Sequence, residues 1–291
     1  MKVLVGLPAY DEAKNIASII LSIQKLGYDV FVCDDFSNDM TSEISKKLGA
    51  IVFRHNSNQG YGGAIQTIFS KARELDVDVL VTIDADGQHD PSDIPKIIEP
   101  LIHSSADLVI GSRFLDNETK MPKYRKVGIE ALTKLANSVN DLDVTDSQSG
   151  FRAYGKNAIK EITPTEDSMG VSSEILIKAA NKKLKISEIP IVVSYDGDTS
   201  THNPASHGLS VVGTTIKLIS IKHPLLFYGL PGIILIGLGV FFAILTLSSF
   251  SENRTIITNQ ALLSIGSFII GVVFLVTSII LFSIISVIKE K

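Results

Sequence analysis

The stretch VLVTIDADGQHDPSD, residues 79 to 93, passes from an apolar run directly into a cluster of acidic side chains. The apolar part predicts a strand that ends near Ile83, and Pro91 followed by Ser92 predicts the start of a helix. Aspartates are common in turns, which explains Asp90. The acidic residues that follow the strand directly need another explanation.

Asp84 and Asp86 alternate along an extended segment, so they share one face and their charges repel each other. A divalent cation removes this repulsion, and carboxylates with an amide such as Gln88 are hard oxygen ligands that suit Mg²⁺ or Mn²⁺. The D-x-D pattern is short and occurs by chance, so a plain solvated turn remains the alternative on this stretch alone. We expect Asp84, Asp86 and Gln88 to be metal ligands.

Strand and helix patterns alternate around this stretch. The expected strands are 2–7, 29–33, 50–54, 77–83 and 107–111, and the expected helices are 15–26, 41–48, 61–74 and 92–103. This order predicts an α/β fold with right-handed crossovers and a mostly parallel sheet. Ligands of such sheets bind at the carboxyl ends of the strands. Four polar clusters fall there: PAYDE, DDFSND, DADGQHD and GSR.

The pattern changes after residue 111. Residues 124–139 and 171–183 have helical spacing, and DVTDSQSGFRAY between them predicts a polar turn that leads into a short strand. Residues 185–193 predict a strand interrupted by Pro190, which favours an edge position. The polar segment 195–208 has no periodicity, and we expect a loop there.

The C-terminal part differs in composition from the rest of the chain. Residues 224–251 and 255–288 contain no charged side chain, and each exceeds the roughly 20 residues that a membrane-crossing helix needs. We therefore expect three parts: a catalytic domain (1–208), a linker (209–223) and a transmembrane hairpin with spans of about 225–250 and 261–288. For the linker, a helix on the bilayer surface and an ordinary packing helix both remain open.

Basic residues flank the hairpin on one side of the expected membrane. They are Lys217, Lys222, His223, Lys289 and Lys291. Because positive residues stay in the cytoplasm, this bias predicts an integral membrane protein with its catalytic domain and C-terminus on the cytoplasmic side.

Charge and motifs exclude several other functions. A net charge of −4 gives no broad basic surface, which argues against nucleic acid as a partner. The chain has no G-x-x-x-x-G-K-[ST] motif and no G-x-G-x-x-G after its first strand, which argues against a P-loop and an ordinary dinucleotide fold. The glycines of NQGYGGAI, residues 58–65, would then permit close packing or backbone approach to a ligand.

The motifs PAYDE, VCDDFSND, NQGYGGAI, TIDADGQHDP, GSRF and DSQSGFRAY occur in this order between residues 8 and 154. Together they resemble family 2 glycosyltransferases of the GT-A fold, in particular dolichol-phosphate mannose synthase and related polyprenyl-phosphate sugar transferases, over roughly residues 2 to 200. The resemblance implies a nucleotide-diphosphate sugar as donor, a polyprenyl or dolichyl phosphate as acceptor, and Mg²⁺ or Mn²⁺ as cofactor.

The resemblance also implies roles for single residues. Nucleoside contacts would come from Pro8, Tyr10, Glu12 and Asp35; metal ligation from Asp84, Asp86 and Gln88; phosphate contacts from Arg113, Arg125 and Arg152. Asp86, Arg113 and Arg125 would be the catalytic residues. The alternatives are structural: Pro8 and Tyr10 shape a turn, Asp35 caps the helix that begins at Thr41, and Arg125 is a surface charge.

Three further residues have weaker assignments. Glu174 is a candidate for sugar or acceptor contacts, with a solvated helix carboxylate as the alternative. His202 and His207 lie in the 195–208 loop, which we expect to act as a lid rather than as a zinc site, because no other cysteine and histidine cluster accompanies them.

The acceptor's chemistry defines the expected mechanism. A phosphate monoester has a second pKa of about 6, so it is largely a dianion at neutral pH and needs no strong general base. The expected reaction is an inverting hexose transfer, with GDP-mannose favoured as donor. The alternatives are UDP-glucose or UDP-N-acetylglucosamine as donor, or a nucleotide-sugar-binding protein without turnover. A processive synthase is disfavoured, because a chain without tryptophan lacks the Q-x-x-R-W motif.

Overall fold

The computed structural model describes residues 1–115, 123–140, 142–193, 220 and 224–289. The chain divides into two compact units, Met1–Thr215 and Ile216–Lys291. The expected linker, residues 209–223, lies outside the described residues except for Ser220.

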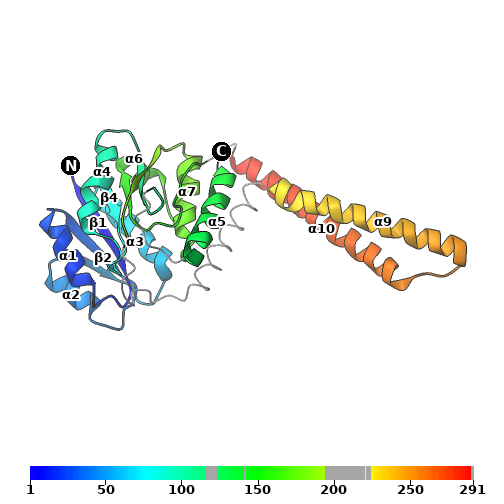
Figure 1. The fold of residues 1–291 in the computed structure, drawn as a ribbon, viewed down its shortest axis with the longest axis horizontal. Helices are drawn as coiled ribbons and strands as arrows, with labels where there is room; N and C mark the ends of the chain where they lie inside the picture. The colour runs from blue at the N-terminus through cyan, green and yellow to red at the C-terminus, as the bar shows by residue number, and fades with distance from the viewer. Residues whose placement is uncertain (116–122, 141, 194–219, 221–223, 290–291) are drawn as a thin grey trace. The chain divides into compact units, whose positions relative to one another are not determined.

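A seven-stranded sheet, in the order β3-β2-β1-β4-β6-β5-β7, forms the centre of the first unit (Figure 1). Its strands are β1 (Val3–Ala9), β2 (Asp29–Asp34), β3 (Ile51–Arg54), β4 (Val79–Thr82), β5 (Leu108–Ser112), β6 (Arg152–Gly155) and β7 (Ile186–Pro190). Only β6 pairs antiparallel with its neighbours among these strands. This confirms the mostly parallel α/β sheet, and β7 occupies an edge as its proline predicted.

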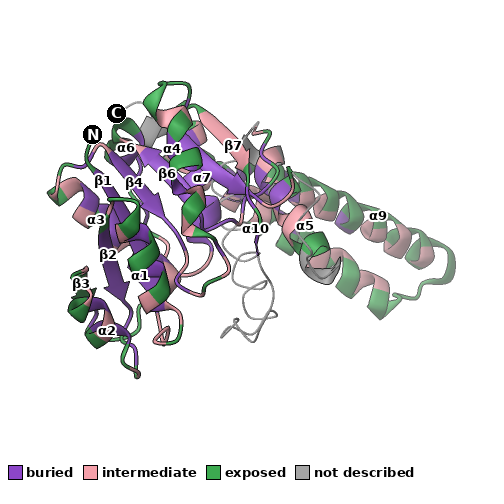
Figure 2. Ribbon diagram, turned by 60° about the vertical axis from the view of Figure 1, so that its left-hand side comes forward, coloured by how far each residue is buried: buried purple, intermediate pink, exposed green. Residues whose placement is uncertain are grey.

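Helices cover both faces of the sheet. They are α1 (Ile16–Lys25), α2 (Thr41–Lys47), α3 (Gly60–Glu74), α4 (Ile94–Ile102) after the short 3₁₀ turn η1 (Pro91–Asp93), α5 (Lys123–Asn140), α6 (Lys156–Glu161) and α7 (Val171–Asn181). One buried cluster joins the sheet to α1 and α4, and a second joins it to α3, α6 and α7. Figure 2 shows buried strands lying between helices whose outer faces are exposed.

Successive residues of β1 point into different clusters. Val3, Val5 and Leu7 belong to the cluster with α1, whereas Leu4 belongs to the cluster with α3. This period of two is typical of a strand between two helical layers. Burial of both faces therefore explains why β1 is apolar throughout.

The reversed direction of β6 brings an additional loop to the edge of the sheet where β4 and β5 end. Thr82 at the end of β4 pairs with Arg152 at the start of β6. The residues that precede β6 therefore lie at the edge where β4 and β5 end. The parallel strands contribute the residues that follow them to this edge. The antiparallel strand β6 instead contributes the residues that precede it, the loop 146–151.

The second unit is a pair of long apolar helices. A π-helix η2 (Leu225–Gly229) leads into α9 (Leu230–Asn253), and α10 (Thr258–Lys289) follows. The segments 225–253 and 258–285 are long and apolar enough to cross a membrane, and only 11% of the most hydrophobic window of each is buried. Figure 1 shows the two helices side by side. Exposed apolar surface along both helices is typical of lipid-facing segments rather than of core helices.

Glycines allow α9 and α10 to approach closely. A Cβ added at Gly232 would lie 2.9 Å from the carbonyl oxygen of Gly271, so both positions require glycine for this spacing. The hydroxyl of Ser264 also donates to the carbonyl of Gly239, at 2.8 Å. Small residues at helix contacts and hydroxyl bonds between helices are typical of membrane helix pairs.

Candidate active site

An acidic turn follows β4. The strand ends at Thr82, one residue earlier than expected, so the aspartates lie in the turn beyond it. Asp84 and Asp86 are half-buried, and Ala85 between them is buried. The backbone N–H of Gln88 donates to Asp86 Oδ1 at 3.0 Å. The three expected metal ligands therefore lie within a single turn.

Asp84 has neighbours on both of its oxygens. The hydroxyl of Tyr61 donates to Oδ1 at 3.0 Å, and Nε2 of His89 lies 3.8 Å from Oδ2. The Asp84 side chain is nevertheless 30% exposed. Burial raises the pKa of Tyr61 well above its usual value, so its hydroxyl keeps its proton at neutral pH. Tyr61 therefore acts as a donor to a carboxylate that still faces open space.

The sequence analysis assigned no role to His89. This histidine is buried, its ring lies 5.5 Å from that of Phe151, and Nδ1 has no hydrogen-bond partner among the described residues. Burial lowers the pKa of His89, although Asp84 acts in the opposite direction. Its position in TIDADGQHD was the signal in the sequence that could have drawn attention to His89. Its burial could not be predicted, because the burial of a turn residue depends on strands that are distant in sequence.

Negative charge accumulates at this edge of the sheet. Burial raises the pKa of Glu12 to about 7; repulsion from Asp86, Asp39 and Asp84 adds to this rise, and a hydrogen bond from Asn15 opposes it. The Asn15 amide donates to Glu12 Oε2 at 3.2 Å and to the carbonyl of Asp86 at 3.1 Å. Burial is the main cause of the shift, but the repulsion from three carboxylates indicates a negative potential at this edge, which favours a cation.

The donor set fits an open metal site rather than a closed one. Within the described residues, no three His, Cys, Asp or Glu side chains converge into a cluster that could hold a metal ion. Mg²⁺ in proteins is commonly bound by one or two carboxylates, with waters and substrate phosphates completing its shell. Asp84, Asp86 and the Gln88 amide match that chemistry.

Arg113 pairs with a buried carboxylate beside the acidic turn. Its Nε and Nη2 donate to Asp146 Oδ2 and Oδ1 at 2.6 and 2.8 Å. Burial raises the pKa of Asp146, but Arg113 outweighs this and holds it below its usual value. Glu188 accepts hydrogen bonds from the N–H groups of Thr145 and Asp146, at 2.7 and 3.0 Å. Arg113 therefore fixes the loop before β6, a role that the sequence analysis did not assign.

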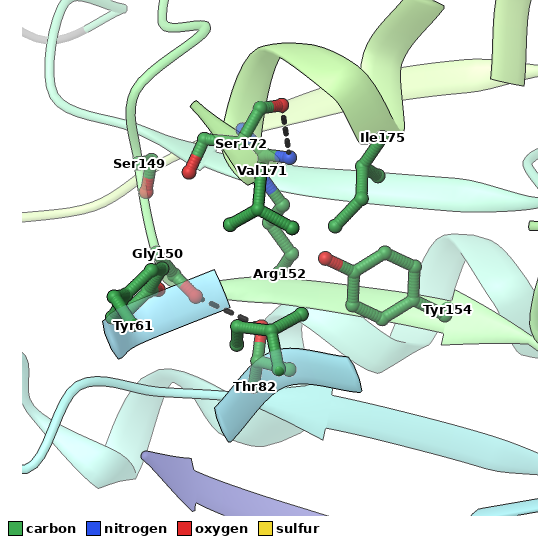
Figure 3. Close-up of a pocket in the computed structure, with 10 residues that line it drawn as sticks. Tyr61, Thr82, Ser149, Gly150, Arg152, Tyr154, Val171, Ser172 and Ile175 are labelled. Carbon is green, nitrogen blue, oxygen red and sulfur yellow. Dashed lines mark hydrogen bonds between the residues drawn. The ribbon is translucent and has the colours of Figure 1, made fainter. Parts of the chain in front are cut away.

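Arg152 lies inside the protein, which disagrees with the expected phosphate contact. Its side chain is among the largest that are fully buried, and its Nη1 and Nη2 donate to the carbonyls of Ser172 and Ser147 at 2.9 and 2.7 Å. A cavity with room for about one water molecule lies beside it (Figure 3). Arg152 Nε has no partner among the described residues, and a water in this cavity would satisfy it. A guanidinium bonded to backbone in this way supports the fold.

Asp35 caps a helix, but not the one that begins at Thr41, which the structural alternative named. It is buried, and it accepts the N–H groups of Gln59 and Gly60, both at 2.8 Å, at the start of α3 rather than of α2. His55 Nδ1 lies 2.6 Å from Asp35 Oδ1, and His55 Nε2 lies 2.9 Å from Thr67 Oγ1. The expected contact between Asp35 and a nucleoside remains a prediction, but both carboxylate oxygens already have protein partners.

Pro8 and Tyr10 lie at the carboxyl end of β1, as their expected role requires. Pro8 is a buried strand residue paired with Cys33, and Tyr10 is half-buried just beyond the strand. The amide of Asn38 lies 3.5 Å from the Tyr10 hydroxyl. Contacts of Pro8, Tyr10 and Glu12 with a nucleoside remain predictions.

Neither reading of Glu174 agrees with the structure. Its side chain is 4% exposed, and its oxygens accept the backbone N–H of Thr165 at 3.1 and 3.0 Å and that of Glu166 at 3.0 Å. Burial acts to raise the pKa of Glu174, but Lys178, 2.6 Å away, and Thr165 hold it below its usual value. Glu174 is therefore neither a solvated carboxylate nor free to contact a sugar; it anchors the segment before α7.

The glycines of NQGYGGAI permit close packing within the chain. The N–H groups of Gly62 and Gly63 both point to the carbonyl of Asp167, at 2.9 and 3.4 Å. A Cβ at Gly60, whose φ is +82°, would lie 2.6 Å from the same carbonyl oxygen. The start of α3 is thus covered by the chain itself.

Three sequence predictions lie outside the described residues. Arg125 belongs to α5, but the structure does not describe its side chain. His202 and His207 fall in the segment 194–219, which is also not described. Their expected roles stay predictions.

Comparison with known proteins identifies the family of this chain. A family model described as glycosyl transferase family 2 matches residues 4–163. A UDP-N-acetylglucosamine–dolichyl-phosphate N-acetylglucosaminyltransferase of Methanococcus voltae is 38% identical, over 65% of this chain and 84% of that protein. A dolichol-phosphate mannosyltransferase of Pyrococcus furiosus is 35% identical, over 65% of this chain and 56% of that protein.

A solved structure has a similar fold. It is the glucosyl-3-phosphoglycerate synthase of Mycobacterium tuberculosis in complex with Mn²⁺, uridine diphosphate and phosphoglyceric acid, with a TM-score of 0.61 and 22% identity. The similarity covers 75% of this chain and 78% of that chain. At this level of identity it supports the fold alone.

Proposed function

The chain belongs to glycosyltransferase family 2, and we propose that it transfers a hexose from a nucleotide-diphosphate sugar to a lipid phosphate. The proposed acceptor is a polyprenyl phosphate such as dolichyl phosphate, and the transfer inverts the anomeric carbon. One observation carries the proposal. The same chain combines an acidic turn at the carboxyl edge of its sheet with two helices long and apolar enough to cross a membrane. A lipid phosphate keeps its tail in the bilayer, so its transferase benefits from being anchored there.

In this proposal the acidic turn binds the diphosphate of the donor through a divalent cation. Asp84, Asp86 and Gln88 would hold Mg²⁺ or Mn²⁺, which would stabilise negative charge on the departing nucleoside diphosphate. The half-buried positions of Asp84 and Asp86 support this role, because neither residue is sealed inside the protein. The raised pKa of Glu12 supports it as well, since a cation offsets the repulsion at this edge.

The acceptor phosphate is itself the nucleophile. It is largely a dianion at neutral pH, so the site needs to reduce repulsion between acceptor and donor rather than remove a proton. Arg113 and Arg125 are the proposed cations for this task. The side chain of Arg113 is 13% exposed while it pairs with Asp146, so its guanidinium is oriented before any ligand binds.

GDP-mannose is the first proposed donor and UDP-N-acetylglucosamine the second. The mannosyltransferase of P. furiosus supports the first. The N-acetylglucosaminyltransferase of M. voltae supports the second, and the match covers a larger share of that protein. Pro8, Tyr10 and Glu12 are the proposed contacts to the nucleoside.

The hairpin is proposed to span the membrane, with the first unit and the C-terminus in the cytoplasm. The basic residues that flank the hairpin, before the first span and after the second, support this orientation.

The experiment uses the full-length protein in liposomes that contain dolichyl phosphate, with labelled GDP-mannose, UDP-N-acetylglucosamine and UDP-glucose tested singly with Mg²⁺ or Mn²⁺. We expect a labelled lipid product from one donor, its loss in EDTA, and its loss in Asp86→Ala at near-normal expression. Donor consumption without any lipid product would refute the acceptor. A complete absence of consumption with all three donors would favour the binding protein without turnover.

A further inference from the structure

Tyr61 makes a direct contact with the acidic turn that the proposed mechanism does not yet use. Its hydroxyl donates to Asp84 Oδ1 at 3.0 Å. Tyr61 is the second residue of α3, so this contact joins NQGYGGAI to TIDADGQHD. The residue is half-buried and lines a small cavity (Figure 3). A hydrogen bond from a packed side chain can hold a carboxylate in one orientation.

The backbone around Tyr61 is fixed on both sides. Before it, Gly60 donates its N–H to Asp35 Oδ2 at 2.8 Å. After it, Gly62 donates its N–H to the carbonyl of Asp167 at 2.9 Å. Two anchors from distant parts of the chain therefore determine where the tyrosine ring lies. The buried Asp35 carboxylate and the close glycine packing thus both fix the backbone next to Tyr61.

The Asp84 carboxylate also packs closely against Gly150. A Cβ added at Gly150 would come closer than 3.0 Å to both carboxylate oxygens and to Cγ of Asp84, a separation that real Cβ atoms essentially never show. The carbonyl of Gly150 accepts a hydrogen bond from Thr82 Oγ1 at 2.9 Å, which ties the loop before β6 to the end of β4 (Figure 3). The Asp84 carboxylate is thus held by the Tyr61 hydroxyl and packs against Gly150, while part of it stays exposed.

We infer that Tyr61 is a positioning residue that orients the Asp84 carboxylate for a divalent cation. The inference rests on the proposed function only in assigning Asp84 to the metal. Groups that orient metal ligands through hydrogen bonds typically change metal affinity by about 10–100-fold when they are removed. Tyr61 itself touches neither the cation nor the sugar in this assignment.

The test is Tyr61→Phe in the full-length protein, which removes the hydroxyl and keeps the ring. Tyr154→Phe is the matched control. Tyr154 lines the same cavity, is fully buried, and packs edge-on against Phe69 at 4.8 Å, so its substitution removes a hydroxyl but leaves the bond to Asp84 in place. Mn²⁺ is titrated in the presence of UDP or GDP, and the free Mn²⁺ is measured by electron paramagnetic resonance.

We expect Tyr61→Phe to weaken Mn²⁺ binding at least 10-fold. Tyr154→Phe leaves the hydrogen bond to Asp84 in place, so its Mn²⁺ affinity should match that of the wild type. In transfer assays, raising the Mn²⁺ concentration should restore kcat to Tyr61→Phe, because the defect lies in metal affinity. Unchanged Mn²⁺ affinity in Tyr61→Phe would overturn the inference, and so would an equal loss in both variants, which would indicate a general effect on the cavity.

These outcomes are separate from failure of the proposed function. Wild-type protein that binds Mn²⁺ with a nucleotide but forms no lipid product would refute the acceptor and leave the role of Tyr61 standing. Wild-type protein that forms product but binds no Mn²⁺ would overturn the role of Tyr61 and leave the transfer standing.

Discussion

Arg113→Ala should destabilise the first unit, even when no acceptor is present. The substitution leaves the Asp146 carboxylate without its forked partner, and the Asp146 side chain has 0% exposure. Removing one partner of a buried ion pair destabilises a protein by about 3–5 kcal/mol. The backbone N–H groups of residues 113 and 148 still donate to Asp146, both at 3.2 Å, so we expect the lower end, about 3 kcal/mol. That is a large part of a typical total of about 5–15 kcal/mol.

The pH dependence of this loss has a definite sign. In the wild type, Arg113 outweighs burial and holds the pKa of Asp146 below its usual value, so the pair stabilises the fold above a pH of about 4 and loses its effect as the pH falls further. In Arg113→Ala, burial dominates and raises the pKa of Asp146. Stability is then lost as the pH rises through the raised value. The deficit relative to the wild type should therefore be smaller at pH 5 than at pH 8.

The assay is pulse proteolysis of full-length protein in detergent across a urea series, at pH 5 and pH 8. The double variant Arg113→Ala/Asp146→Asn is the control, because it also removes the buried charge. Its loss of unfolding free energy at pH 8 should be smaller than that of Arg113→Ala. This loss should also be nearly the same at pH 5 and pH 8. A deficit below about 1 kcal/mol for Arg113→Ala at pH 8 would refute the reasoning, since it would match an exposed pair. A deficit that grows towards pH 5 would refute the assigned sign.

Three further changes have defined outcomes. Gly150→Ala should lower metal affinity by at least 10-fold in a Mn²⁺ titration, because its Cβ would displace the first aspartate of the D-A-D turn. Gly155→Ala, whose Cβ would meet its nearest atom at 3.5 Å, should match the wild type; equal effects of the two would contradict the steric argument. Burial and nearby carboxylates raise the pKa of Glu12 to about 7. The stability that this group contributes to the fold is therefore lost as the pH rises from about 4.5 to 7. Over the same range Glu12 gains a negative charge, so the affinity for Mn²⁺ should increase. A pH profile of Mn²⁺ binding checks this, and an equally steep profile in Glu12→Gln would reject the assignment to Glu12. Gly232→Leu should separate the two long helices and make the hairpin sensitive to protease in detergent, whereas Gly237→Leu, with no atom within 4 Å of its Cβ, should not; identical sensitivity would contradict the packing.

Local patterns predicted the elements of the fold well. Ile16, Ile19, Ile20 and Ile23 have helical spacing, and all four are buried on one face of α1. Pro190 marked the edge strand, since proline cannot donate to a neighbouring strand. Signals of this kind lie within a few residues, so a single sequence contains them.

Pairings between distant residues were not predictable in the same way. The strand that follows DSQSG was expected, but its place between β4 and β5 and its reversed direction depend on contacts such as Thr82 with Arg152, which no local pattern encodes. Arg113 and Asp146 are 33 positions apart. The motif resemblance indicated loops at the carboxyl edge of the sheet, but it could not show that the side chain of Arg152 is buried and bonded to backbone carbonyls.

The covered start of α3 has an electrostatic consequence. In many nucleotide-binding proteins, unpaired amide groups at the first turn of a helix hold phosphate. Here the carbonyl of Asp167 and the carboxylate of Asp35 already occupy those amides. The amides at the start of α3 are therefore not available to the proposed donor. If its diphosphate is held through a divalent cation, as proposed, its affinity should follow the concentration of free Mg²⁺ or Mn²⁺.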